Sequence, residues 1–270
     1  MLAEEIIEKL SILPVEGLKI HEQTIEANVR ALRETMLNHG RLVDPLVVDR
    51  EHHVVLDGNH RREVLSQLKA ENAVCQAVDY DDPSIRIGAW YLAVKSAPAG
   101  LLDHGENVDP AAGFEALQRM DATFMRMSQK GGSRQCTLIP SAGKNLSAVL
   151  REQEEAVSRL TNGHKVNGNG DSLVYVEDSR IDYFLQEGYT VFARRTFTKE
   201  EIIREAVAGR PLPPKSTRHL IPNRIIRLNF HLGHLNEPKE VSEQLLIDMV
   251  KKRVLYGSAR YYTEPVIVMY

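Results

Sequence analysis

Apolar residues recur every three or four positions in several stretches of the chain, and this spacing is typical of amphipathic helices. The clearest stretch is 24–38, whose helical spacing is kept by Ile25, Val29, Leu32, Met36 and Leu37. Thr24 can cap this helix, and Asn38-His39-Gly40 supplies a glycine stop. Another helix should begin at Thr198, where Glu201 completes a capping box. Further helices are predicted over residues 1–12, 59–69, 110–129, 145–161, 179–186 and 240–254.

Short apolar runs bounded by turn residues predict strands. Pro45–Val48 and His53–Leu56 lie on either side of a charged turn, so we expect them to form a hairpin. Residues 85–94 fit either a strand or a buried helix, because periodicity does not decide between the two. Further strands are predicted at 74–78, 173–177, 189–195 and 224–230. Strands and helices are intermixed along the whole chain, which indicates an α+β or α/β protein.

The length of 270 residues favours two domains, and a hydrophobic content of 43% is enough for one or two cores. The segment Ser96–Gly100, rich in alanine and proline, looks like a linker or a long crossover. We therefore predict a first domain over residues 1–95 and a second over 96–270.

The formal net charge of -3 argues against a dedicated nucleic-acid-binding protein, because contacts with phosphates normally require an excess of lysine and arginine. The N-terminal segment carries Glu4, Glu5 and Glu8 where a signal peptide would be basic. No apolar stretch reaches about 18 residues, so we expect a cytoplasmic protein without a membrane partner. Cys75 and Cys136 suit neither a disulfide framework nor a zinc ribbon, and we expect small thiols that are buried or half-exposed.

The segment Val54–Arg62 combines the features of an anion site. A strand ends at Asp57-Gly58 and a helix follows, so backbone N–H groups, the helix dipole and the side chains of Arg61 and Arg62 come together. Such a junction suits a phosphate, and Asp57 stands where a carboxylate could hold Mg²⁺. The alternative is that Asp57-Gly58 only makes a turn and that both arginines are solvated.

Two other segments carry unusual polar groups. Lys19–Gln23 places Glu22 before a helix, where its carboxylate could face a cleft or simply lie on the surface. Lys215–His219 lies in a stretch from Ala206 to Asn236 that contains no carboxylate but several basic residues. Charges are usually mixed on solvated surfaces, so this stretch suggests contact with anions. An exposed basic loop and a nucleic-acid patch are the alternatives.

Several common motifs are missing from the sequence. The ten histidines occur without HExxH or paired-carboxylate spacing, so no structural metal site is expected. The P-loop and Rossmann glycine motifs are also missing, and neither of those nucleotide-binding folds is indicated.

The order of these pieces resembles the ParB/sulfiredoxin-like superfamily. The resemblance rests on Ile20-His21-Glu22-Gln23, an amphipathic helix, Pro45 before a hairpin, and Val55-Leu56-Asp57-Gly58-Asn59-His60-Arg61. Within that superfamily, Trp90-Tyr91 and Lys215-Ser216-Thr217-Arg218-His219 look like free serine kinases, which phosphorylate L-serine itself. The resemblance implies an α+β fold with a ParB/sulfiredoxin-like N-terminal domain, a second α/β lobe and a site in the cleft between them.

Two rivals and one departure qualify this resemblance. Sulfiredoxin needs a reactive cysteine in the loop 57–61, which contains none. ParB-type partition proteins carry a G-E-R-R-like element there, whereas this chain has Asn59-His60. The serine kinases have histidine at the position of Asn59. Asparagine can still donate to a phosphate or coordinate through its oxygen, so we expect the loop to keep its role.

The resemblance also implies roles for individual residues. Glu22 is the expected catalytic base, Asp57 holds Mg²⁺, and the phosphates of ATP or ADP are bound by Gly58, Asn59, His60 and Arg61. Serine is bound by Trp90, Lys215, Ser216, Thr217, Arg218 and His219, and the fork of Arg218 matches its carboxylate. The competing function is a ParB-like transcriptional regulator that binds nucleotide and DNA without amino-acid kinase activity. Formation of O-phosphoserine separates the two.

Overall fold

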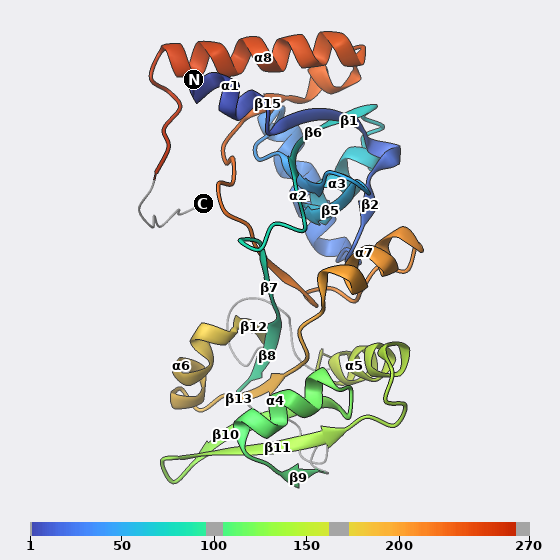
Figure 1. Cartoon of the computed structure of the whole chain (residues 1–270), viewed down its shortest axis with the longest axis vertical. Coiled ribbons are helices and arrows are strands. Elements are labelled where there is room, and N and C mark those ends of the chain that lie inside the picture. Colours follow the sequence, from blue (N-terminus) through green and yellow to red (C-terminus); the bar gives the residue numbers. More distant parts are fainter. Residues whose placement is uncertain (1, 96–104, 162–172, 263–270) are drawn as a thin grey trace. The chain divides into compact units, whose positions relative to one another are not determined.

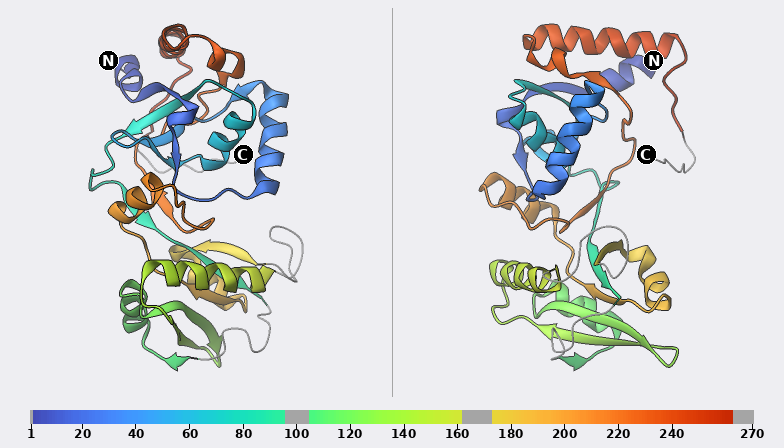
Figure 2. Two further views of the ribbon diagram at one scale, coloured as in Figure 1. Left: turned by 90° about the vertical axis from the view of Figure 1, so that its right-hand side faces the viewer. Right: turned by 180° about the vertical axis from the view of Figure 1, so that it is seen from behind.

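The computed structural model describes residues 2–95, 105–161 and 173–262, which form two compact units (Figure 1). Unit 1 consists of Met1–Asp82, Ala206–Arg210 and Ile221–Tyr270, and unit 2 of Pro83–Glu205 and Pro211–Leu220. Figure 2 shows both units from two further sides. This division differs from the one expected at residue 95, because the chain returns from unit 2 and completes the core of unit 1.

Unit 1 is built on a mixed five-stranded sheet of order β1-β6-β4-β5-β2. Its strands are β1 (Leu10–Pro14), β2 (Lys19–Ile20), β4 (Leu46–Asp49), β5 (Val54–Asp57) and β6 (Asn72–Val78). The predicted hairpin is confirmed as the antiparallel pair β4–β5, whereas β4 pairs with β6 and β2 with β5 in parallel. All positions of β4 are buried, as is usual for a strand covered on both faces.

The helices of unit 1 largely follow the predicted pattern. They are α1 (Leu2–Ile7), α2 (Glu26–His39), α3 (Asn59–Gln67) and α8 (Lys239–Leu255), with short 3-10 turns η1 (Val15–Gly17) and η3 (Leu232–Asn236). Gly40 ends α2 in the left-handed conformation at φ 63°, as predicted. The predicted Thr24 cap is wrong, since Ile25 takes the capping position. The predicted helix 1–12 is also too long, because its second half forms β1 and pairs with β6.

One apolar cluster fills unit 1 and includes residues from both ends of the chain. Phe230, Leu246 and Val250, which come from the returning segment, are buried in the same cluster as Ile12 and the strands of the sheet. A short ladder between β3 (Arg41–Leu42) and β15 (Phe230–His231) also holds this segment. The strand predicted over Arg224–Phe230 is wrong up to Asn229, because β15 begins only at Phe230. Cys75 is buried in this core, as expected.

Unit 2 contains an antiparallel six-stranded sheet of order β12-β8-β13-β10-β11-β9. The strands are β8 (Trp90–Val94), β9 (Glu106–Asn107), β10 (Ala122–Lys130), β11 (Ser133–Pro140), β12 (Val174–Glu177) and β13 (Thr190–Ala193). Outside the sheet, β7 (Arg86–Gly88) pairs with β14 (Arg218–Leu220). The segment 85–94, left open between strand and helix, is therefore two strands.

Helices pack on both faces of this sheet. They are α4 (Pro110–Gln118) and α6 (Ile181–Gln186) on one face and α5 (Leu146–Thr161) on the other, and the turn η2 (Asp178–Arg180) precedes α6. Away from the sheet, Ile202 of α7 (Lys199–Val207) is buried in a separate small cluster with Phe197 and Leu212. Tyr91 and Ala93 of β8 join the cluster that contains α4 and α6, whereas Leu92 and Val94 join the cluster with α5. This alternation follows from the two-residue period of a strand.

The predicted helix 110–129 is wrong in its second half. The helix α4 ends at Gln118, Met120 turns the chain with a left-handed φ of 63°, and β10 begins at Ala122. Within β10, Phe124 belongs to one apolar cluster, while Met125 and Met127 belong to the other. A run of apolar residues that is buried on both faces of a sheet imitates a buried helix in sequence.

Candidate active site

The first group of candidate residues lies in unit 1, at the junction between β5 and α3. The chain leaves β5 at Asp57 and enters α3 at Asn59, and Gly58 between them has φ 105°, a left-handed value that favours glycine. A Cβ atom on Gly58 would lie 3.0 Å from the Arg61 guanidinium. The predicted strand–turn–helix is thus confirmed, and the positive end of the α3 dipole lies at this junction.

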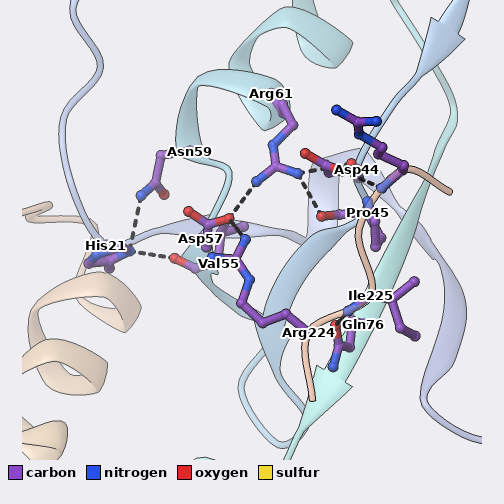
Figure 3. Close-up of polar contacts among 11 residues, drawn as sticks. His21, Asp44, Pro45, Val55, Asp57, Asn59, Arg61, Gln76, Arg224 and Ile225 are labelled. Atoms are coloured by element: carbon purple, nitrogen blue, oxygen red, sulfur yellow. Dashed lines mark hydrogen bonds and ion pairs between the residues drawn. The ribbon is translucent and has the colours of Figure 1, made fainter. Parts of the chain in front are cut away.

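Asp57 accepts hydrogen bonds from two guanidinium groups. Arg61 Nη2 and Arg224 Nη2 each lie 2.5 Å from Asp57 Oδ2 (Figure 3). Burial opposes ionisation of this carboxyl, but the two guanidinium groups outweigh burial and hold the pKa of Asp57 below its usual value. Asp57 is therefore a carboxylate at neutral pH. Arg224 was not among the predicted site residues. The sequence pointed to it only through its place in the stretch from Ala206 to Asn236, which contains no carboxylate.

Arg61 also holds the junction to the start of β4. Its Nη1 donates to the carbonyl oxygens of Asp44 and Pro45, at 2.9 and 2.7 Å. Arg62 donates from Nε to the carbonyl oxygen of Leu18 at 3.2 Å. The alternative that both arginines are solvated is therefore wrong, because each one stabilises the backbone around the junction.

The segment with Glu22 is fixed against the same junction by His21. The buried His21 directs Nδ1 at the carbonyl oxygen of Val55, and the side-chain amide of Asn59 lies 3.0 Å from the same nitrogen. His21 Nε2 lies 3.7 Å from Oε1 of Glu22, whose side chain is only 13% exposed. Glu22 is therefore not a simple surface carboxylate.

The side chains of Asn59 and His60 both make contacts within unit 1. The Asn59 side chain is buried beside His21 rather than open to a phosphate, so the backbone N–H is what this residue offers there. His60 Nε2 accepts a hydrogen bond from the N–H of Ile25 at 3.1 Å. This contact satisfies the backbone donor of Ile25 at the start of α2.

The second group lies in unit 2 around Trp90, at the start of β8. Lys215 Nζ is 5.5 Å and the Arg218 guanidinium carbon 5.6 Å from the centre of the indole ring, so both cations contact Trp90. Arg218 also forms an ion pair with Glu177 at the end of β12. Two cations, an aromatic ring and one carboxylate are thus grouped within one unit.

The loop before β14 is held by its own hydrogen bonds. Ser216 is fully buried, and its hydroxyl donates to the carbonyl oxygen of Pro213 at 2.7 Å. Thr217 is buried beside it, and His219 follows in β14, where it pairs with Ile87 of β7. The Ser216 side chain therefore shapes the loop, and its contact with substrate stays a prediction.

Arg194 connects the segment at Trp90 with the loop at Lys215, and sequence reasoning missed it. Its side chain is 2% exposed, Nε donates to the carbonyl oxygen of Trp90 at 2.9 Å, and Nη2 donates to that of Lys215. A buried guanidinium that contacts both segments fixes the distance between them. Its position at the end of a predicted strand gave no sign of this role.

The structure thus assembles the predicted residues in two places. Unit 1 holds Glu22, Asp57, Gly58, Asn59, His60 and Arg61. Unit 2 holds Trp90, Lys215, Ser216, Thr217, Arg218 and His219. The expected cleft between two lobes stays a prediction.

A magnesium ion fits this donor set in one of its usual modes. Among the described residues, no three or more His, Cys, Asp or Glu side chains gather to hold a metal ion. Magnesium at phosphoryl-transfer sites is commonly held by one or two carboxylates together with substrate phosphates, and the ionised Asp57 can supply one such carboxylate.

No helix in the described part of the chain is long and apolar enough to cross a membrane.

Comparison with known proteins gives relatives over most of the chain, although no protein-family model matches it. An ADP-dependent L-serine kinase SerK of Thermococcus kodakarensis is 26% identical over 83% of this chain and 91% of its own length. An ATP-dependent L-serine kinase of Staphylothermus marinus is 24% identical over 78% of this chain and 85% of its own. The solved structure of a free serine kinase in complex with AMP is 20% identical, with a TM-score of 0.65 over 84% of this chain and 93% of the other. The chain therefore shares the fold of that structure.

Proposed function

We propose that this protein transfers a phosphoryl group from ATP or ADP to the hydroxyl of free L-serine and forms O-phospho-L-serine. The observation that carries the proposal is the similarity to L-serine kinases over 83% of the chain. The two residue groups agree with it, because one suits phosphates and the other suits a small charged substrate.

The phosphate end of the reaction is assigned to the β5–α3 junction. The first N–H groups of α3 and its dipole favour an anion, and Gly58 allows close approach of the backbone. We assign the contact with the nucleotide phosphates to Gly58, Asn59, His60 and Arg61. A bound Mg²⁺ would neutralise phosphate charge, and Asp57 is the carboxylate that we assign to it.

Glu22 is assigned the proton transfer. A carboxylate positioned at the serine hydroxyl accepts its proton while the hydroxyl oxygen attacks phosphorus and the bond to the nucleotide breaks. The small exposed fraction of Glu22 and its place beside the buried His21 give this carboxylate a defined position. Defined positions matter because phosphoryl transfer depends mainly on orientation and charge neutralisation.

The serine end is assigned to the group around Trp90. Arg218 presents a planar fork suited to a carboxylate, and Trp90 supplies a flat wall against the small side chain. Lys215 adds a second positive charge, and Thr217 and His219 complete the assigned set.

We also propose a ParB/sulfiredoxin-like layout for unit 1, supported by its mixed sheet with the β5–α3 junction.

The test is the direct formation of O-phosphoserine. The purified chain is incubated with L-serine, Mg²⁺ and either ATP or ADP, and the product is identified by ³¹P NMR or mass spectrometry. We expect O-phosphoserine with at least one nucleotide. If neither nucleotide yields product, the proposal is wrong, and retention on DNA at physiological salt would then favour a nucleotide-binding regulator.

A further inference from the structure

Glu177 occupies a position that the proposed reaction has not used. In the antiparallel pair β12–β8, Glu177 stands directly opposite Trp90. Directly opposed residues place their side chains on the same face of a sheet, about 4.5–5.5 Å apart at Cβ. The carboxylate of Glu177 therefore lies on the Trp90 face, where Arg218 contacts it.

The ion pair of Glu177 and Arg218 is only half-buried. The side chain of Arg218 is 29% exposed and that of Glu177 is 25% exposed, so small solutes can reach both. A pair with partial access to solvent contributes little net stability, about 0–1 kcal/mol, and opens at small cost. Such a pair presents one positive and one negative group side by side next to an aromatic ring.

Free serine at neutral pH carries the complementary charges on one carbon atom, an ammonium group and a carboxylate. We infer that Glu177 binds the ammonium group of the substrate while Arg218 binds its carboxylate, so the charge pair recognises the substrate as a zwitterion. The substrate exchanges one protein–protein ion pair for two charge-assisted contacts with the protein. This inference rests on the proposed function.

Recognition of the ammonium group by Glu177 restricts the choice of substrate. A serine whose nitrogen is acylated, as in N-acetylserine or within a peptide, has no ammonium group and would leave Glu177 without a partner next to Arg218. Such compounds forfeit the charge-assisted contact with Glu177, so they should bind about 10–150-fold more weakly than serine. Glu177 would therefore separate the free amino acid from protein-bound serine.

The test combines variants of Glu177 with two analogues of serine, each of which lacks one of its charged groups. The compound 3-hydroxypropionate is serine without its amino group, and ethanolamine is serine without its carboxylate. Each is measured as a substrate or as a competitive inhibitor, beside serine. We expect Glu177→Gln to weaken serine about 10–150-fold, the cost of one charge-assisted hydrogen bond, and to change 3-hydroxypropionate by less than about threefold. Glu177→Asp should recover part of the serine affinity.

Two controls separate this role from a structural one. If Glu177 only holds Arg218 in place, Glu177→Gln weakens serine and 3-hydroxypropionate alike, and the inference is overturned. It is also overturned if serine is unaffected. Asp178→Asn removes a neighbouring exposed carboxylate and should change neither compound. If the wild-type chain forms no O-phosphoserine, the proposed function fails, and calorimetric binding of serine to wild type and Glu177→Gln still tests Glu177 separately.

Discussion

Arg224 and Asp57 are 167 positions apart in the chain, and their side chains meet at one carboxylate oxygen. Arg61 contacts the same oxygen from α3. The segment that returns to unit 1 thus supplies a second positive charge to the junction. This arrangement keeps the carboxyl of Asp57 ionised and fixes its orientation.

The pH dependence of stability should reveal this pair. The pKa of Asp57 is lowered in the folded protein, so its contribution is present above the unfolded value of about 3.9 and is lost as pH falls through the lower folded value. We expect Asp57→Asn to lower the free energy of unfolding at pH 7 by about 1 kcal/mol, as for partly exposed ion pairs. Urea unfolding at pH 7, 4 and 3 should show the difference shrinking with acid. The exposed Asp81→Asn is the control. If wild type and Asp57→Asn differ by the same free energy of unfolding at every pH, the lowered pKa of Asp57 is contradicted.

Replacing Glu22 should affect the chemical step. Glu22→Gln keeps the size of the side chain but removes the base, which usually contributes about 10²–10⁴-fold. We expect kcat to fall by this factor while nucleotide affinity stays nearly unchanged. Glu26→Gln alters an exposed carboxylate at the start of α2 and should leave kcat intact. Near-normal turnover of Glu22→Gln would show that another group takes the proton.

Arg218 and Asp57 should act on different substrates. Arg218→Ala removes the proposed partner of the serine carboxylate, so KM for serine should rise about 10–150-fold. Asp57→Asn should chiefly raise KM for the nucleotide and the Mg²⁺ concentration that gives half-maximal activity. Steady-state kinetics with each substrate varied in turn distinguishes the two effects. A rise of only the nucleotide KM in Arg218→Ala would reverse the assignment of the two groups.

The left-handed Gly58 should be intolerant of a side chain. Gly58→Ala forces a strained φ of 105° and places a Cβ 3.0 Å from the Arg61 guanidinium, which must then move away from Asp57. We expect a loss of about 1–3 kcal/mol in the free energy of unfolding together with weaker nucleotide binding. Gly17→Ala is the matched control, since its Cβ would meet nothing within 4 Å. Equal stability of the two variants would contradict the prediction.

The cysteines should react slowly in the folded protein. Burial raises the pKa of the Cys75 thiol far above its usual range and also raises the pKa of Cys136. The thiolate is the reactive form, and its fraction at a given pH falls about tenfold each time the thiol pKa rises by one. Labelling with a thiol reagent at pH 8, followed by mass spectrometry, should modify Cys136 before Cys75. In urea both should react at similar rates, and fast native labelling of Cys75 would contradict the described core.

Local signals in the sequence were reliable where neighbouring residues supply the interaction. Gly40 ends α2 because a left-handed residue closes the last turn. Thr198 and Glu201 exchange hydrogen bonds as a capping box, with the Glu201 N–H donating to Thr198 Oγ1 and the Thr198 N–H donating to Glu201. Each feature lies within four residues, so the pattern contains the whole cause.

Interactions between distant segments were not predictable in the same way. The pairing of Arg224 with Asp57 and the contact of His60 with the start of α2 depend on which segments the fold brings together. Arg194 was equally hidden, since a buried arginine that donates to two carbonyl groups looks like any basic residue in a sequence. The candidate residues could be named from motifs, but their partners could not.

The path of the chain between the two units sets the order in which they can be completed during synthesis. Translation delivers β1 to β6 first, yet the core of unit 1 also contains Phe230, Leu246 and Val250. At about 5–20 residues per second, those partners emerge roughly 10–30 s later. All of unit 2 is made in the interval, since its last residue is Leu220. The half that begins first on the ribosome is therefore finished last, with an incomplete apolar core until the final helix is made.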